Sequence, residues 1–530
     1  MALPAALVPL RNGTFRTLWG AGVIAWLGMW LQNTGAGWLM TSLAPDPLIV
    51  SMVQAATIMP VFLLALPGGA MADIVDRRVF LIGCQVWTFA AAALLAILTL
   101  SGAMTAPWLL ILTFVIGIGT ALNNPAWSAV VPELVPREDL VQAIALNGIG
   151  FNLTRAIGPA LAGFLILLGG PSLAFCMYAV SITTVIAALI HWRRNTRHFT
   201  GLPREHFLSA MRAGMRFVRN TPAIRSAMMR TIAYSIPCAA PWGLLPLFVR
   251  QELGLGAGMY GVILGAMGAG GVASGMLLPM FRKHFSRGRT VLLCTLSSCA
   301  GMALLSFAHH WTLAAFGMLL FGIGWTSAYA TMQASAQLAC PPWVRARALS
   351  IYQLAQNGAL TIGSFGWGWL AGDIGMPLTL GIAAGVGATL AIGALGFRIE
   401  AIASPIAPAP REAALTPEAP AAELVPLLRN ARGRVMETAH YMVTPAEREA
   451  FMAIMREVRL LRGRTGAQFW QIYENVAHPE GWVEIWSMES WTDHLREAGR
   501  QSDSDRALLA RAAAYQHESN RPARYLAFDP

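Results

Sequence analysis

Long apolar runs dominate the first 397 residues of the chain, and short alternating patterns replace them near its end. A helix needs about 20 apolar residues to cross the roughly 30 Å of hydrocarbon in a bilayer. Twelve runs meet that length, at residues 18–41, 48–72, 79–101, 107–131, 140–168, 172–192, 226–249, 257–281, 290–308, 311–337, 347–371 and 377–397. The pattern predicts an all-α membrane protein with twelve transmembrane helices, followed by a different kind of domain.

The last hundred residues have the pattern of a soluble α+β domain. Trp482, Glu484 and Trp486 alternate with Val483 and Ile485, as expected for a half-buried strand. We predict strands at 434–443, 466–477, 481–489 and 523–528, and helices at 445–462, 490–499 and 503–517. This β-α-β-β-α-β order is ferredoxin-like.

Composition supports the membrane assignment of the first part. The chain is 55% apolar and 12% charged, whereas soluble proteins carry about 25% charged residues. Charged residues number 31 in residues 1–397 and 28 in residues 429–530. All six cysteines lie in or beside apolar segments, and no CxxC occurs, so we expect no disulfide and no metal site.

The basic residues alternate from loop to loop. One set of loops holds Arg11, Arg16, Arg77, Arg78, Arg137, Arg193, Arg194, Arg197, Arg204, Arg212, Arg216, Arg219, Arg282, Lys283, Arg287, Arg289, Arg345, Arg347 and Arg398. The other set holds Arg250 alone. This asymmetry predicts cytoplasmic N- and C-termini, and it explains the net charge of +11 without a nucleic-acid partner. The first run is long and has no clear cleavage site, so we expect no cleaved signal peptide.

Five segments follow from these patterns. We expect a six-helix bundle over 1–195, an inter-half loop over 196–223, a second bundle over 224–398, an Ala/Pro-rich linker over 399–428 and the soluble domain over 429–530. The inter-half loop contains a candidate amphipathic helix, 204–220. Its apolar stripe fits either a helix in the lipid headgroup region or a soluble linker helix.

The two bundles repeat each other at an offset of 205 residues. The segment Val115–Gly119 matches Leu320–Gly324, and the match continues without a gap. Further pairs are Pro136 with Pro341, Asn152 with Asn357, Gly158 with Gly363, and Gly163 with Gly368. Duplicated halves are typical of transporters, whose substrate site lies near the midplane between them.

The loop after the second run carries a family resemblance. It has Gly69, Asp73 four residues later, and then the basic pair Arg77 and Arg78, and it resembles the signature loop of the major facilitator superfamily. The family usually has Gly before the basic pair, where this chain has Asp76. The resemblance implies two pseudo-symmetric six-helix halves and a conformational latch formed by this loop.

A second motif narrows the resemblance. Gly158, Pro159 and Gly163 resemble the Gly-Pro helix-packing motif of the superfamily's exporters, although Thr154 and Ala162 stand where the fullest motif has Gly. Together with the tail segment Gly481–Arg496, the chain resembles the bacterial transmembrane secretion effector family, which is close to enterobactin-type exporters. This implies a proton-coupled exporter of small hydrophobic or siderophore-like molecules in a bacterial cytoplasmic membrane, working by alternating access.

One ionisable residue, Arg155, lies clearly inside a predicted span, where a charge costs a few kcal/mol or more. It either attracts an anionic substrate or pairs with a protonatable acid, or else it reaches the interface or neighbouring carbonyls.

Amides cluster near the same level, and the substrate-cavity candidates among them are Asn33, Asn123, Asn124, Asn152, Gln356 and Asn357. Buried amides either line a water-filled cavity or bond helix to helix. Trp30, Trp127, Trp242 and Trp367 are candidates for stacking on a flat substrate, but Trp more often anchors at the interface.

The sequence does not identify the energy source for transport. No nucleotide-binding loop occurs, and no Asp or Glu lies deep within a span, so a coupling proton must use a flanking acid or travel with the substrate. We expect no cofactor. The alternatives are an importer, a non-transporting scaffold, and a transporter fused to an enzyme.

The tail resembles the dimeric α/β-barrel domains that include small cofactor-free monooxygenases. Its only candidate site residues are His494, Trp491, Tyr473 and Asn475. We expect dimerisation, regulation or cargo contact rather than catalysis, with a homodimer formed through this domain.

Overall fold

The computed structural model describes residues 5–74, 76–192, 207–341, 343–396, 434–501, 503–516 and 523–526. The predicted linker 399–428 and the basic residues between 193 and 204 lie outside these ranges, as does Arg398. The chain folds as two compact units. The first comprises Met1–Leu202, Ala227–Ala334 and Tyr352–Ile399, and the second comprises Pro203–Ser226, Ser335–Ile351 and Glu400–Pro530.

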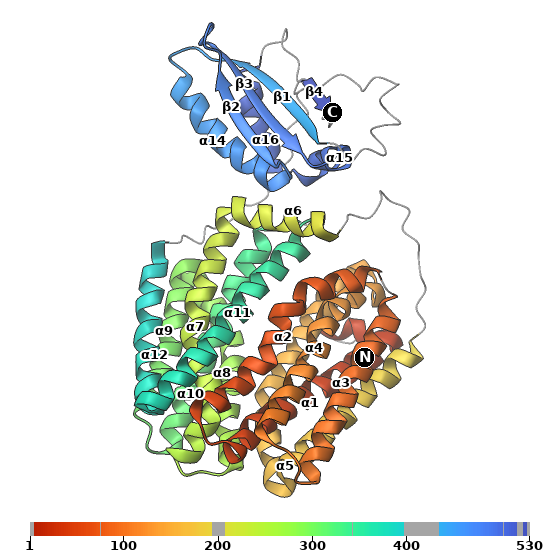
Figure 1. Ribbon diagram of the computed structural model, residues 1–530, viewed down its shortest axis with the longest axis vertical. Helices are drawn as coiled ribbons and strands as arrows, with labels where there is room; N and C mark the ends of the chain where they lie inside the picture. The colour runs from red at the N-terminus through yellow and green to blue at the C-terminus, as the bar shows by residue number, and fades with distance from the viewer. Residues whose placement is uncertain are drawn as a thin grey trace. The chain divides into compact units, whose positions relative to one another are not determined.

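Long helices build the first unit (Figure 1). Those of the first half are α1 (Gly13–Leu43), α2 (Pro47–Ile74), α3 (Arg77–Leu100), α4 (Ala106–Leu134) and α5 (Leu140–His191). Those of the second half are α7 (Pro222–Gln251), α8 (Ala257–His284), α9 (Arg287–Ser306), α10 (Trp311–Leu338), α11 (Arg345–Ile374) and α12 (Met376–Gly393). Short 3-10 helices lie at Ala5–Arg11, Arg137–Asp139 and Ala394–Gly396.

Two of the predicted runs, 140–168 and 172–192, lie on the 52-residue α5. The helix is kinked between them, because Gly169 and Gly170 leave helical geometry. Gly170 has φ of 72°, a left-handed conformation that glycine adopts at little cost. Pro171 follows and restarts the helix with its fixed φ.

Nine of the helices in the described ranges are long and apolar enough to span a membrane. The 31-residue α1 and the 30-residue α11 are as long but are not among these nine. The amides of the two helices lie in their middle turns: Gln32 and Asn33 in α1, and Gln356 and Asn357 in α11. Polar residues at that depth mark helices that face a bundle interior rather than lipid.

Residues related by the 205-residue offset make equivalent contacts. A Cβ added at Gly158 on α5 would lie 2.5 Å from Trp30 on α1, and one at Gly363 on α11 would lie 2.5 Å from the Ile236 carbonyl on α7. Gly163 on α5 contacts α8, and its counterpart Gly368 on α11 contacts α2. The sequence repeat is therefore a repeat of helix packing.

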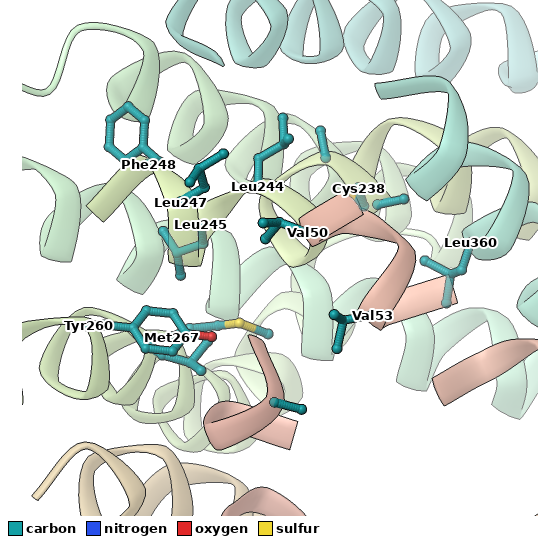
Figure 2. Packing of buried hydrophobic residues seen from close by; sticks show 14 of the residues in the cluster. Val50, Val53, Cys238, Leu244, Leu245, Leu247, Phe248, Tyr260, Met267 and Leu360 are labelled. Carbon is teal, nitrogen blue, oxygen red and sulfur yellow. The ribbon is translucent and has the colours of Figure 1, made fainter. Parts of the chain in front are cut away.

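The two halves share one apolar core. Val50 of α2 lies beside Leu244 of α7 (Figure 2), and Val53, Leu245 and Tyr260 belong to the same buried cluster. All five side chains are at most 5% exposed. Because lipid is as apolar as these side chains, close van der Waals packing rather than transfer out of water holds the halves together here.

The second unit contains a four-stranded antiparallel sheet of order β2-β3-β1-β4. The strands are β1 (Val435–Met442), β2 (Phe469–Glu474), β3 (Gly481–Met488) and β4 (Ala523–Leu526), and the helices are α14 (Arg448–Thr465), α15 (Trp491–Arg500) and α16 (Asp503–Ala513). Helices α14 and α16 cover one face of the sheet (Figure 1). Phe451 of α14 and Trp482 of β3 meet in that core with ring centroids 5.8 Å apart.

The same unit includes α6 (Phe207–Asn220), at the place of the predicted amphipathic helix. Phe217 of α6 packs edge-to-face on Trp343, which lies between α10 and α11. The Trp343 indole N–H donates to the Arg500 carbonyl of α15 at 3.0 Å. On the charged side of α6, Arg212 pairs with Glu489 at 3.0 Å. This ion pair binds the tail domain to α6. The sequence had predicted that the charged side of this helix lies beside lipid headgroups or in water.

Candidate substrate cavity and gate

The two halves touch at the helix ends that carry few arginines, called here the arginine-poor side. It comprises the connections α1–α2, α3–α4, α7–α8, α9–α10 and α11–α12. Arg250, at the end of α7, donates to Thr41 Oγ1 of α1 at 2.9 Å and also to Ser42. Its guanidinium lies 5.5 Å from the ring centroid of Trp38, which stacks on Tyr260 of α8. These contacts close the arginine-poor side.

Helices α5 and α8 continue this contact toward the middle of the membrane unit. A Cβ added at Gly163 would lie 2.8 Å from the Gly261 Cα, and one at Gly268 would lie 2.4 Å from the Ala156 Cα. The neighbours are backbone atoms, which do not move aside as a flexible side chain does. Small residues at such positions let membrane helices approach closely.

The α5–α8 contact ends at Arg155. Beyond it toward the opposite ends of the helices, Gly148 of α5 and Gly275 of α8 are exposed, and an added Cβ at either would meet nothing within 4 Å. Asn152 is also exposed. The two helices therefore separate on the arginine-rich side.

Arg155 lies at the point where the helices separate. Its guanidinium donates to Thr326 Oγ1 of α10 at 2.6 Å and rests over Gly271 of α8, where an added Cβ would be 2.8 Å from the guanidinium nitrogen. The residue is half-buried. A cation from the first half is thus held by the second half at the inner end of their contact.

A cavity of about 240 Å³ lies between the halves. Helices α1, α2 and α5 line it from one half, and α7, α8 and α10 from the other. Trp30 and Trp242 both line it and stack on each other, with ring centroids 6.2 Å apart and planes 26° apart. Asn33 is the predicted cavity residue that lines it.

The other predicted cavity residues are placed elsewhere. Asn123 accepts a hydrogen bond from Gln85 at 3.1 Å within the first half, and Asn152 donates to the Gly148 carbonyl of its own helix. Asn124 is exposed, and Gln356 and Asn357 are half-buried on α11. Asn123 therefore bonds one helix to another, which is one of the two roles expected for a buried amide.

The predicted latch residues lie at the junction of α2 and α3. Gly69 and Asp73 are on α2, with side chains outside the described part of the structure. Asp76 caps α3 by accepting from the backbone N–H groups of Arg78 and Val79. Arg77 starts α3, and Arg78 donates to the Leu189 and Ile190 carbonyls at 2.9 and 2.6 Å, so it caps the end of α5. The Asp that replaces the family's Gly is therefore a helix cap.

The Gly-Pro packing motif of α5 contacts both α1 and α8. Gly158 admits Trp30 of α1, while the Pro159 carbonyl and Gly163 lie against Gly261 of α8. Gly158 thereby sets the position of an indole that lines the cavity.

Two arginines were missed as functional candidates. Arg230 is 6% exposed on α7, and its guanidinium donates to the Gly288 carbonyl of α9 at 3.4 Å. Arg250 binds across the halves, as described above. Its isolation in the arginine-poor loops was the signal that could have identified it.

The tail holds a buried charge network. Arg462 donates to Glu484 at 3.1 Å and to Glu497 at 2.8 Å, and His494 Nδ1 lies 2.5 Å from Glu437 Oε1. Glu437, His494 and Glu497 offer three ligand atoms within 4.8 Å of one another. Because Arg462 already binds one of these carboxylates, the contacts fit an ion-pair network better than a cation site.

The tail's four candidate residues are divided between the two faces of the sheet. Trp491 and His494 stack with ring centroids 4.9 Å apart on the side of Glu437. Tyr473 pairs with Val483 on the opposite face, and Asn475 accepts hydrogen bonds from the Ala477 and His478 amides in a turn. They do not form a common site.

We expect the network to weaken in acid. Burial alone raises the pKa of Glu437, but the hydrogen bond from His494 and the charges of His494, Arg462 and Arg524 outweigh burial and lower it. A lowered pKa contributes stability above the ordinary carboxyl pKa of about 4.3, and this is lost as the pH falls through the folded-state pKa. Glu437→Gln should therefore cost about 1–3 kcal/mol at pH 7 and progressively less toward pH 3.

Hydrogen exchange of β1 and α15 in the intact chain measures this difference, with both proteins compared at each pH. A difference independent of pH would contradict the assignment.

Comparisons with known proteins agree with this architecture. A family model described as transmembrane secretion effector matches residues 4–527. The staphyloferrin A transporter of Staphylococcus aureus is 22% identical over 302 residues, 54% of this chain and 72% of that protein. Macrolide efflux protein A of Streptococcus pyogenes is 21% identical over 285 residues, 53% of this chain and 69% of that protein. The enterobactin exporter of Escherichia coli is 27% identical over 217 residues, 41% of this chain and 50% of that protein.

Solved structures resemble the membrane unit. A bacterial homologue of the iron transporter ferroportin, in an inward-facing state, has a TM-score of 0.57 at 16% identity, covering 72% of this chain and 98% of that one. A bacterial homologue of the human lysosomal transporter Spinster, inward-facing and unoccupied, has a TM-score of 0.53 at 13% identity, covering 75% of this chain and 95% of that one. At these identities the likeness shows the fold alone.

Proposed function

Because the chain belongs to the transmembrane secretion effector family of major facilitator transporters, we propose that it exports small hydrophobic or siderophore- or drug-like molecules by alternating access. The observation that carries the proposal is the asymmetric contact between the halves. Arg250 and the α5–α8 glycines hold the arginine-poor side together, and the same helices separate beyond Arg155. An arrangement closed on one side and separated on the other is one end state of a rocking cycle.

The proposal includes twelve spans. Helices α1 and α11, and the two arms of α5 counted separately, add to the other long helices to give two sets of six. The bundles would cover 1–195 and 224–398. With the arginine-rich side in the cytoplasm, both termini would be cytoplasmic in a bacterial inner membrane, and the described state would be open inward.

Export is supported by the relatives, whose names describe a staphyloferrin transporter, a macrolide efflux protein and an enterobactin exporter. The test is efflux from a deletion strain, with and without the gene, across a panel of siderophores and antibiotics. Accumulation of at least one compound in the deletion strain supports export. Uptake into whole cells with no uptake into inverted vesicles would instead indicate an importer.

We propose proton coupling as the energy source. Asp46, Glu252 and Asp373 are exposed at the arginine-poor ends of α2, α7 and α11, and Asp73 lies near the arginine-rich end of α2. A coupling proton would bind one of these acids or travel with the substrate. Efflux that is unchanged when the pH gradient is collapsed would reject this part of the proposal.

We also propose that the tail is a ferredoxin-like dimerisation domain. Its strand order and antiparallel pairing fit that fold. The sheet face opposite α14 and α16 is apolar and exposed: Met436 is 37% exposed, Phe469 48%, Tyr473 49% and Tyr525 52%. A second copy of this face, packed about 10 Å away sheet on sheet, would cover it.

Tyr473→Asp should convert a dimer to a monomer, because it places a charge in the middle of that face. Light scattering of the intact protein in nanodiscs measures the mass, and Glu457→Asp on α14 is a charge-conserving control. A wild-type protein that is monomeric would contradict the dimer.

A further inference from the structure

The cavity between the halves contains polar atoms without partners. The Trp30 indole N–H, the Asn33 carbonyl oxygen, the Thr34 hydroxyl and the Trp242 indole N–H are buried and make no hydrogen bond to another protein group. All four residues line the cavity. Trp30 is 7% exposed and Thr34 is 1% exposed, so neither can turn to bulk solvent. A buried donor or acceptor without a partner is costly, so a ligand that supplies the partner gains affinity.

These atoms define a hydrogen-bonding pattern. Two indole N–H groups donate, the Asn33 oxygen accepts, and the Thr34 hydroxyl can do either. The two indoles come from different halves, one from α1 and one from α7. A group that satisfies both indoles at once would therefore bind the two halves together.

The shape and charge of the lining restrict that group further. Trp30, Trp242, Tyr260 and Phe321 supply flat apolar walls. None of the residues that line the cavity is Asp, Glu, Lys, Arg or His. A charged ligand would have no counter-ion in this cavity, and two converging N–H donors would oppose a cation.

The volume sets the size. Engineered apolar cavities of about 150 Å³ bind benzene, and drug-sized sites measure about 300–1,000 Å³. A cavity of about 240 Å³ is large enough for one or two fused rings. It would hold one ring-bearing portion of a larger molecule.

We propose that this cavity is a subsite for an uncharged, planar ring system that accepts hydrogen bonds from Trp30 and Trp242 and donates one to Asn33. It rests on the proposed transport function and names the substrate chemistry that the central cavity selects. Gly158 is a positioning residue for this subsite, because any side chain there would displace Trp30.

A series of naphthalene probes tests the proposal. The intact protein in nanodiscs is dialysed against 2-naphthol, naphthalene, 2-naphthoate and 2-naphthylmethylammonium, and binding to empty nanodiscs is subtracted. We expect 2-naphthol to bind about tenfold more tightly than naphthalene, and both charged probes to bind more weakly than 2-naphthol. Equal binding of 2-naphthol and naphthalene, or tighter binding of either charged probe, would overturn the proposal.

Trp242→Phe keeps a flat ring and removes one donor. We expect it to weaken 2-naphthol binding about two- to tenfold, the worth of one hydrogen bond, and to leave naphthalene binding unchanged. Trp369→Phe is the matched control, because Trp369 is 62% exposed on α11. If the Trp242 variant does not fold, Thr34→Val tests the same prediction by removing a different polar group from the cavity. Unchanged 2-naphthol binding in both cavity variants would exclude the subsite.

The efflux assay separates this proposal from the function. Wild-type efflux without selective 2-naphthol binding would refute the subsite and leave the exporter. Selective 2-naphthol binding without efflux of any panel compound would refute the exporter and leave the subsite.

Discussion

Gly163→Leu should lower efflux about fivefold or more while the protein still inserts and is expressed. The added side chain would enter a space where a Cβ alone lies 2.8 Å from the Gly261 Cα and 2.9 Å from the Ala257 carbonyl oxygen. Overpacking against atoms that cannot move costs about 1–3 kcal/mol, and 1.4 kcal/mol changes an equilibrium tenfold. The cost falls on the state that is closed on the arginine-poor side, so the cycle would stall.

Efflux rates per copy of membrane-inserted protein measure this effect. Gly148→Leu is the matched control, because it lies on the same helix and an added Cβ meets nothing within 4 Å. Gly261→Val should reproduce the loss from the α8 side of the same contact. Wild-type efflux from both contact variants would show that the close approach of α5 and α8 is not needed for transport.

Arg155→Met should also reduce efflux about tenfold or more, with a smaller effect on folding. The change keeps much of the apolar stem and removes the cation that donates to Thr326 at the end of the α5–α8 contact. A charge-assisted hydrogen bond contributes about 1.5–3 kcal/mol, and it is available only while the two helices are together.

Two further variants separate the charge from the hydrogen bond. Thr326→Val removes the acceptor and leaves the charge, and Arg155→Lys keeps the charge and loses the planar donor group. We expect Thr326→Val to lose about as much efflux as Arg155→Met, because it removes the same hydrogen bond, and Arg155→Lys to retain more. Unaltered efflux by Arg155→Met at normal expression would assign the residue to packing alone.

The sequence predicted most element positions because each depends on local patterns. The predicted run 257–281 lies on α8 at Ala257–His284, and the predicted strand 481–489 lies on β3 at Gly481–Met488. Apolar length and side-chain alternation are both readable along the chain. The 205-residue offset even pairs Gly158 with Gly363, which make equivalent contacts.

The candidate site was less predictable because it depends on which faces of different helices meet. Depth along a helix placed Asn33 and Asn123 in one set, but Asn33 lines the cavity while Asn123 bonds to Gln85 within the first half. Rotation about the helix axis separates the two, and the amide composition does not reveal it. Arg250 was missed for a related reason, since its partners Thr41 and Ser42 lie on a helix 209 and 208 residues away in sequence.

Paired spin-label distances on the two sides of the membrane unit test alternating access most directly. One pair, Ser42→Cys with Gln251→Cys, spans the arginine-poor side, and the other, Glu138→Cys with His284→Cys, spans the arginine-rich side, both in a background without the six native cysteines. The account predicts that an exported compound changes the two distances in opposite senses, the first becoming longer as the second becomes shorter. Two distances that stay fixed, or that change in the same sense, would contradict it.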